Sequence, residues 1–337
     1  MTAERCAAQL LCGDRAGSAE EVAGRLLAIQ AQDLRGARLA IRARSAGLAA
    51  SDVDAALARR SLVVTWLNRG TLHLVRAEDY WWLHPLTTPQ LRTGNFRRLA
   101  QEGVPPDDAE RAVAAVRAAL AADGPQTRSQ LRERVAAAGV RTEGQAMVHI
   151  LALASIRGLI VRGPAAGRDQ AFVLTRDWLG APPPAMSRET ALGELARRYL
   201  AGHAPAADRD LARWAGIGLG DARLGLARCG AARRTDGRAG LPAGPRRAAV
   251  ALPPKLLGAF DPLLLGWASP DPIVGPHRRT VIAGGLFRPF ALAGGRAVAT
   301  WTIARGQVVL APFAPLDASI QAALDTDAAD VMRFLGG

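Results

Sequence analysis

The chain has 337 residues, of which 43 are Lys or Arg and 30 are Asp or Glu, giving a formal net charge of +13 and a pI near 11.2. No stretch approaches the roughly 18 to 20 apolar residues of a membrane span, and the N-terminus lacks the basic and apolar blocks of a signal peptide. The three cysteines and five histidines have no metal-ligand spacing. We therefore expect a cytoplasmic protein that does not bind a membrane and that uses no metal and no cofactor.

The positive charge favours a polyanionic partner, most simply nucleic acid. An alternative stays open, because Lys255 is the only lysine and a GC-rich genome would place arginine at many unconstrained positions. Charge therefore has to be supported by a fold and a site. The length allows two or three modest domains, each with its own core.

The first predicted helix leads into a pair of glutamines. Ser18 caps a helix whose apolar residues recur at helical spacing up to residue 29, and Gln30 and Gln32 follow. Residues i and i+2 lie about 200° apart on a helix but on one side of an extended chain. Both amides can face one substrate only if the helix ends before Gln30, and residues 33–36 favour such an ending.

A change of period marks the end of the first unit. Helices are predicted at residues 38–46 and 51–60, the second capped by Ser51. Residues 62–67 and 71–75 then alternate as strands around an Asn-Arg-Gly turn. Three helices followed by a hairpin predict a winged helix-turn-helix.

The same order of elements recurs along the chain, which indicates tandem copies of one module. The second copy has helices and strands predicted at residues 107–122, 127–138, 143–157, 159–162 and 171–174. A stiff proline linker at residues 182–184 precedes a third set of helices at residues 188–201, 207–215 and 220–228.

The C-terminal part is predicted as strands at residues 280–282, 287–292 and 296–303, with a closing helix at residues 317–335. The sequence thus predicts an α+β protein with three tandem winged helix-turn-helix units, a C-terminal β-rich segment and a closing helix. The predicted units cover residues 1–100, 101–180 and 188–337.

The Gln-x-Gln spacing is the most specific chemical feature, although two solvated polar residues would look the same. An amide has no useful pKa and cannot act as a general base at neutral pH. It can accept and donate hydrogen bonds at the same time, and can therefore orient a water molecule or a base edge. Gln30 and Gln32 are accordingly the candidate catalytic residues.

The candidate DNA contacts are basic side chains near the glutamines, in the first hairpin and in the C-terminal segment. His73 has a competing interpretation as a packed residue of the wing, and Arg38 and Arg42 also fit an ordinary solvated helix face. The C-terminal basic, Gly-rich hairpin fits either entry into a DNA groove or the rim of a small sheet. The full set is Arg35, Arg38, Arg42, Arg69, His73, His277, Arg278, Arg279 and Arg288.

Six short motifs together resemble one known family. They are LAIQAQ, RGTLHLV, RRYL, DLARWAG, FDP followed by LGW, and FRP followed by TW, at residues 27–32, 69–75, 197–200, 210–216, 260–267 and 287–301. Their order over nearly the whole chain resembles the tandem winged-helix family that includes the azinomycin-resistance DNA glycosylase, the AlkZ-like family.

The resemblance implies a C-shaped protein of three winged-helix units that takes duplex DNA on a basic concave face. It implies hydrolysis of the N-glycosidic bond of N7-alkylated purines, including crosslinked guanines, with Gln30 and Gln32 at the family's catalytic Gln-x-Gln positions. The expected partner is duplex DNA carrying alkylated purines, and we expect a monomer because no dimerisation coiled coil is visible. Two alternatives remain open: a non-catalytic winged-helix regulator and a protein-interaction scaffold.

Overall fold

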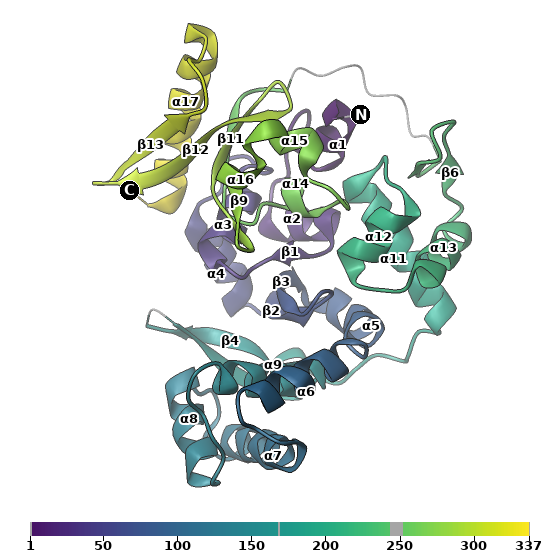
Figure 1. The fold of residues 1–337 in the computed structure, drawn as a ribbon, viewed down its shortest axis with the longest axis vertical. Helices are drawn as coiled ribbons and strands as arrows, with labels where there is room; N and C mark the ends of the chain where they lie inside the picture. The colour runs from purple at the N-terminus through teal and green to yellow at the C-terminus, as the bar shows by residue number, and fades with distance from the viewer. Residues whose placement is uncertain (1, 168, 243–251, 337) are drawn as a thin grey trace. The chain divides into compact units, whose positions relative to one another are not determined.

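The computed structural model describes residues 2–167, 169–242 and 252–336, and these form two compact units (Figure 1). Unit 1 comprises residues 1–56 and 189–337, and unit 2 comprises residues 57–188. Each unit combines helices with antiparallel strands, as predicted. The division between the units falls inside the segment 1–100 that was predicted as one module. None of the helices in the described ranges is both long and apolar enough to cross a membrane.

Unit 1 contains a four-stranded antiparallel sheet. The strand order is β13-β12-β11-β8, and α17 packs against β8 and β13. These strands are β8 (Lys255–Leu257), β11 (Phe290–Ala293), β12 (Arg296–Ala304) and β13 (Gln307–Pro312). Unit 1 also contains two short hairpins, β6 (Ala232–Arg233) with β7 (Ala239–Gly240), and β9 (Ile282–Ala283) with β10 (Leu286–Phe287), and the two-residue strand β1 (Ile29–Gln30).

The helices of unit 1 come from both ends of the chain, and α4 extends two residues beyond the unit boundary. They are α1 (Thr2–Ala8), α2 (Ala19–Leu26), α3 (Leu34–Arg42), α4 (Ala50–Ala58), α11 (Arg188–His203), α12 (Asp208–Ala215), α13 (Leu219–Arg228), α14 (Pro262–Leu265), α15 (Asp271–Val274), α16 (Arg278–Val281) and α17 (Ala318–Leu335). The closing helix α17 has the predicted extent.

An aromatic cluster joins the C-terminal helices of unit 1. The Tyr199 ring stacks on His203 with centroids 4.6 Å apart and lies 5.2 Å from Trp214. The Tyr199 hydroxyl donates to the Gly266 carbonyl at 2.7 Å, and Trp267 Nε1 donates to the His203 carbonyl at 3.0 Å. The Tyr and Trp residues of three sequence motifs are therefore core residues, because large rings bury much area and their polar ends find partners here.

Two glycines allow helices near the glutamine pair to pack at backbone distance. A Cβ on Gly202 of α11 would lie 2.4 Å from the Arg25 carbonyl oxygen of α2. A Cβ on Gly36 of α3 would lie 2.3 Å from the Ala259 carbonyl oxygen. Both helices that flank the glutamines are thus fixed against segments more than 170 residues away in sequence.

A buried ion pair connects the same segments. The Arg44 guanidinium donates to both oxygens of Asp261, from Nη1 at 2.9 Å and from Nη2 at 2.7 Å, and both side chains are fully buried. Arg44 Nη2 also donates to Gln9 Oε1 at 2.7 Å, and the Asp261 carboxylate accepts from the Leu263 backbone N–H at 2.8 Å. The network satisfies the carboxylate on several sides, as a buried charge requires.

Unit 2 has a sheet with strand order β3-β2-β4-β5 and a helical core. Helix α9 is apolar around most of its circumference and nine of its eleven residues are buried. Before α8 begins, Gln126 pairs with Phe172 of β5 in an isolated antiparallel bridge. The elements are β2 (Leu62–Leu67), β3 (Thr71–Arg76), α5 (Ala77–Thr87), α6 (Leu91–Gln101), α7 (Pro106–Asp123), α8 (Arg128–Ala137), α9 (Ala146–Ile156), β4 (Ile160–Ala166), β5 (Asp169–Leu174) and α10 (Thr175–Leu179).

Four local predictions need correction. The helix predicted at residues 38–46 is α3, which begins and ends four residues earlier. Ser51 does not cap a helix, because α4 already begins at Ala50 and the Asp52 carboxylate accepts from the Ala49 N–H instead. Residues 280–282 are largely helical, in α16, and only the last of them enters β9. The strand predicted at residues 287–292 is divided into β10 and β11 around Pro289, which has no N–H to donate to a ladder.

Candidate active site

The glutamine pair lies in a short non-helical segment of unit 1. Helix α2 is capped by Ser18, whose side chain accepts from the Glu21 N–H at 3.1 Å, and it ends at Leu26. Gln30 then closes the two-residue strand β1 (Ile29–Gln30), and Gln32 follows before α3. The prediction that the helix ends before Gln30 is confirmed. Residues 30–32 are therefore not helical, although β1 ends at Gln30 and Gln32 already lies at a bend. The helical arrangement that would place the two amides on opposite sides is thus absent at this pair.

The two amides differ in exposure. Gln30 is 7% exposed, whereas Gln32 is exposed to solvent. A buried amide loses fewer conformations on meeting a substrate than a solvated one, because it is already held. Gln30 is thus suited to holding a substrate group in a fixed orientation. Gln32 is suited to contacting the part of that group that faces the solvent.

Asp33, the nearest carboxylate in sequence, has a structural role. It is the N-cap of α3, and its Oδ1 accepts from the Arg35 backbone N–H at 2.9 Å. A capping carboxylate stabilises a helix N-terminus by roughly 1 kcal/mol. This bond fixes the point at which the non-helical segment ends.

The arginines of α3 have different environments. Arg35 is exposed, and Arg38 Nε donates to Asp54 Oδ1 at 2.9 Å on the surface. Arg42 is only 2% exposed, and its Nη2 donates to the Leu256 carbonyl at 2.7 Å and to Asp327 at 2.8 Å. The prediction of Arg42 as a phosphate contact is therefore wrong, because its guanidinium is neutralised inside unit 1.

The hairpin of β2 and β3 in unit 2 carries Arg69 and His73. Gly70, with φ of 81°, allows the turn, and its N–H donates to the Leu67 carbonyl at 2.9 Å. His73 is buried, and its Nδ1 lies 2.9 Å from the Thr71 carbonyl oxygen. Burial and, secondly, the nearby Arg69 charge lower the pKa of His73 to about 3. His73 is therefore neutral at physiological pH, and its prediction as a phosphate contact is wrong, whereas Arg69 at the turn is half-buried.

We expect the protein to lose stability in acid, because three of its histidines are buried. Burial is the main cause that lowers the pKa of His73 to about 3, of His84 to about 4 and of His203 to about 3, from 6.5. The unfolded chain therefore binds more protons below about pH 6.5, and the free energy of unfolding should fall as the pH falls, by up to about 1.4 kcal/mol per pH unit for each histidine.

Urea denaturation between pH 8 and pH 5 measures this effect. A His84→Gln variant should show a shallower pH dependence, since it retains a side chain that can donate to the Ser155 carbonyl, which lies 2.8 Å from His84 Nε2. A free energy of unfolding that stays constant between pH 7 and pH 5 would contradict the assignment of these histidines as neutral.

The sequence predicts Asn68 as a turn residue. In the structure it has a left-handed φ of 51° and is fully buried, and among the described residues neither its Nδ2 nor its Oδ1 finds a hydrogen-bond partner. The Thr71 hydroxyl in the same turn also has none. Unsatisfied buried polar groups are rare and cost about 1–3 kcal/mol each. This polar turn is therefore a candidate for holding a water molecule or a ligand group, and a sequence pattern gives no signal of burial at a turn.

The basic residues of the C-terminal segment are divided between internal and external contacts. His277 stacks on Phe313 with ring centroids 4.2 Å apart, and Arg278 forms an ion pair with Asp271. Arg279 and Arg288 are exposed on either side of the β9–β10 hairpin. The last two are therefore the ones whose charge is available at the surface, whereas the contacts of His277 and Arg278 weaken their case as phosphate ligands.

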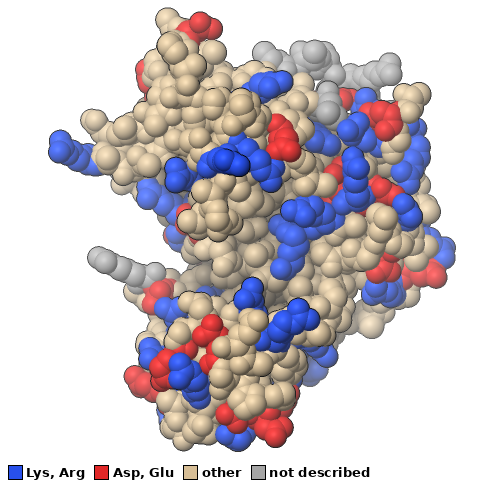
Figure 2. Space-filling model, viewed as in Figure 1, with Lys and Arg blue, Asp and Glu red and all other residues tan. Residues whose placement is uncertain are grey.

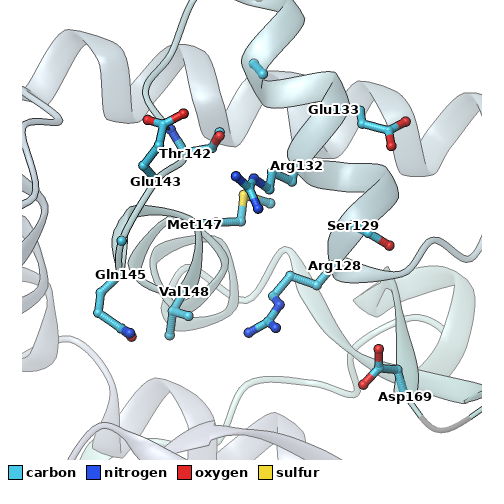
Figure 3. Close-up of a pocket in the computed structure, with 12 residues that line it drawn as sticks. Arg128, Ser129, Arg132, Glu133, Thr142, Glu143, Gln145, Met147, Val148 and Asp169 are labelled. Carbon is cyan, nitrogen blue, oxygen red and sulfur yellow. Dashed lines mark hydrogen bonds between the residues drawn. The ribbon is translucent and has the colours of Figure 1, made fainter.

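A separate hollow of about 710 Å³ lies in unit 2 (Figure 3). It lies between α8 and the beginning of α9, and its charged lining includes Arg128, Arg132, Glu133, Glu143 and Asp169. The mixture of signs gives it no net preference for an anion. Within the described ranges, no group of three His, Cys, Asp or Glu side chains is placed to hold a metal ion.

Comparison with known proteins identifies the class of this chain. The chain belongs to the AlkZ-like DNA glycosylase family, whose model matches residues 23–334. It is 28% identical over 349 residues to the interstrand DNA cross-link repair glycosylase of Streptomyces sahachiroi, which covers 95% of this chain and 91% of that protein. The solved structure of Streptomyces sahachiroi DNA glycosylase AlkZ matches with a TM-score of 0.79 at 27% identity, covering 99% of this chain and 95% of that one.

Proposed function

We propose that this protein is a monofunctional DNA glycosylase that hydrolyses the N-glycosidic bond of N7-alkylated guanine, including guanines in interstrand crosslinks. Its role would be DNA repair or self-resistance to a DNA-alkylating metabolite. The observation that carries the proposal is the placement of Gln30, at the end of β1, and of Gln32, at the bend that follows, between two helices that are anchored at backbone distance. The name of the Streptomyces sahachiroi relative supports crosslinked DNA as a substrate.

The chemistry needs no general acid. Alkylation at N7 gives guanine a positive charge, so the base can leave without being protonated. What remains is to place a water molecule and to stabilise a sugar with oxocarbenium character. The carbonyl oxygens of Gln30 and Gln32 can accept hydrogen bonds from the water, and their N–H groups can orient it.

The environment of Lys255 supports hydrolysis over Schiff-base chemistry. Lys255 is the only lysine of the chain and is 3% exposed, with its Nζ 3.9 Å from Asp327 Oδ1. Burial, as the main cause, lowers its pKa to about 8, which by itself favours the nucleophilic free amine. Only the enclosure of Lys255 therefore argues against a Schiff base. An amine in this enclosed position is unsuited to attack on a deoxyribose carbon.

We retain three tandem winged-helix modules, at residues 1–100, 101–180 and 188–337, as part of the proposal. In the second module the bridge between Gln126 and Phe172 connects the segment before α8 to the hairpin. In the third module, a bridge between Ala206 and Ala239 connects the segment before α12 to the hairpin of β6 and β7. The chain order helix, extended segment, two helices and hairpin also applies to α2, β1, α3, α4 and β2–β3. Gln30 would occupy the bridge position of the first module, and the C-shaped arrangement stays a prediction.

The proposed contacts with the phosphates of the alkylated duplex are Arg35, Arg38, Arg69, Arg279 and Arg288. Arg38 is included because its pair with Asp54 is on the surface, where such pairs contribute about 0–1 kcal/mol and exchange readily for a phosphate. The exposed hairpin β9–β10 would enter a groove next to Arg279 and Arg288.

Leu286 offers a test of this hairpin. It follows the turn glycines Gly284 and Gly285, with φ of 57° and 83°, and is 65% exposed. An exposed apolar side chain at a hairpin tip can wedge between base pairs and unstack them, at about a few kcal/mol per step. We expect Leu286→Ser to lower base release at least about tenfold with little change in the melting temperature, as measured by release kinetics on alkylated duplex DNA. Unchanged kinetics would show that the tip does not enter the helix.

The direct test of the function is release of free N7-methylguanine from alkylated duplex DNA by the purified full-length protein. Release that depends on Gln30 and Gln32 supports the proposal. Salt-sensitive DNA binding without base release from methylated or crosslinked duplexes would instead support a non-catalytic DNA-binding protein.

A further inference from the structure

Helix α6 of unit 2 has an unusual charge distribution. Its eleven residues include Arg92, Arg97 and Arg98 and no acidic residue. All three arginines are exposed, and the one side-chain bond that Arg98 makes in the described structure is to the neutral Gln101. In Figure 2, blue side chains lie over α6, whereas red and blue alternate over α7 and α8.

Several other arginines of unit 2 form ion pairs with acids. Ion pairs connect the following residues: Arg111 with Asp108, Arg134 with Asp123, and Arg157 with Glu110. By contrast, no acidic side chain of the described residues forms an ion pair with the three arginines of α6. An uncompensated row of guanidinium groups attracts a polyanion.

A glycine lies in the middle of the same solvent face. Gly94, Arg97 and Arg98 are spaced i, i+3 and i+4, which places them next to one another on a helix. Gly94 is exposed, and a Cβ added there would meet no atom within 4 Å. Glycine inside a helix costs about 1 kcal/mol relative to alanine, and no neighbouring atom in the described structure requires it here. A partner that approaches the backbone closely would require it.

We propose that this face of α6, defined by Gly94, Arg97 and Arg98, binds the sugar-phosphate backbone of duplex DNA. The inference rests on the proposed function, which supplies the partner. The two guanidinium groups would hold neighbouring phosphates, because their planar donor forks match phosphate oxygens. Because Gly94 has no side chain, the sugar-phosphate strand of the DNA could approach the helix backbone closely next to the two arginines.

The test measures equilibrium binding of the full-length protein to an unmodified duplex, from 50 to 200 mM salt. For an Arg97→Gln, Arg98→Gln double variant we expect the slope of log K against log salt to become shallower by about 1.8, since each lost phosphate contact removes about 0.9. Arg117→Gln is the matched control, because Arg117 is also exposed but lies on α7. A change in slope no larger than that of the control would overturn the inference.

Gly94→Leu separates binding from folding. Leucine is a good helix former, so the melting temperature should be equal or higher, while the side chain should weaken duplex binding at least about fivefold, or about 1 kcal/mol. Binding equal to wild type would overturn the role of Gly94. If the wild-type protein itself fails to bind duplex DNA at low salt, the proposed function falls together with this inference, whereas wild-type binding that all α6 variants retain overturns the inference alone.

Discussion

Arg44→Met is expected to lower the free energy of unfolding by about 3–5 kcal/mol, because it leaves a charged partner unpaired in the interior. Asp261 is fully buried, and both of its oxygens accept hydrogen bonds from Arg44. Methionine fills much of the same volume, so the loss is chiefly electrostatic. The network also holds Gln9, and its loss should loosen the contact between the N-terminal segment and the loop before α14.

Urea denaturation of the purified variant measures this loss. Arg38→Met is the matched control, since Arg38 pairs with Asp54 at the surface, and such a pair contributes at most about 1 kcal/mol. A double variant, Arg44→Met with Asp261→Leu, should recover part of the stability because both charges are gone. A loss below about 1 kcal/mol for Arg44→Met alone would contradict the structural role of the pair.

Gln30→Ala and Gln32→Ala are each expected to lower kcat for base release by about 10²–10³, the usual effect of removing one positioned polar group from a transition state. Equilibrium binding to DNA should change little, because amides contribute less to duplex affinity than charged groups. The two variants should differ in stability. Gln30 is buried, so its truncation should also lower the melting temperature, whereas truncation of the exposed Gln32 should not.

Single-turnover kinetics on alkylated duplex DNA measure kcat without interference from product release. Gln321→Ala on α17 is the control, since Gln321 bonds the neighbouring Asp325 and belongs to no proposed DNA contact. Loss of activity in this control, or full activity in both alanine variants, would contradict the assigned roles.

Local sequence signals were reliable where the physics is local. The end of α2 before Gln30, the start of a helix near residue 127 and the extent of α17 all follow from capping and periodicity. The pairing of Arg42 does not, because its partner Asp327 is 285 residues away. From the sequence, Arg38 and Arg42 look alike as members of one helix face, and only the fold shows that the second one is enclosed.

The candidate site shows the same limit. The Gln-x-Gln pair is visible as a pattern, and the end of the helix before it could be predicted. Burial at a turn could not, so Asn68, with two unpartnered polar atoms among the described residues, gave no signal. The division of the strand at Pro289 follows from a local rule, because proline cannot donate to a strand ladder.

The most direct measurement is the release of N7-methylguanine from alkylated duplex DNA, followed chromatographically for the wild-type protein and for a Gln30→Ala, Gln32→Ala double variant. The account predicts that the wild type releases free base well above spontaneous depurination, and that the double variant binds the same DNA with similar affinity but releases base only at the background rate. Equal release by both proteins would remove the two amides from the centre of the mechanism. No release by the wild type from methylated or crosslinked duplexes would contradict the assignment as a glycosylase.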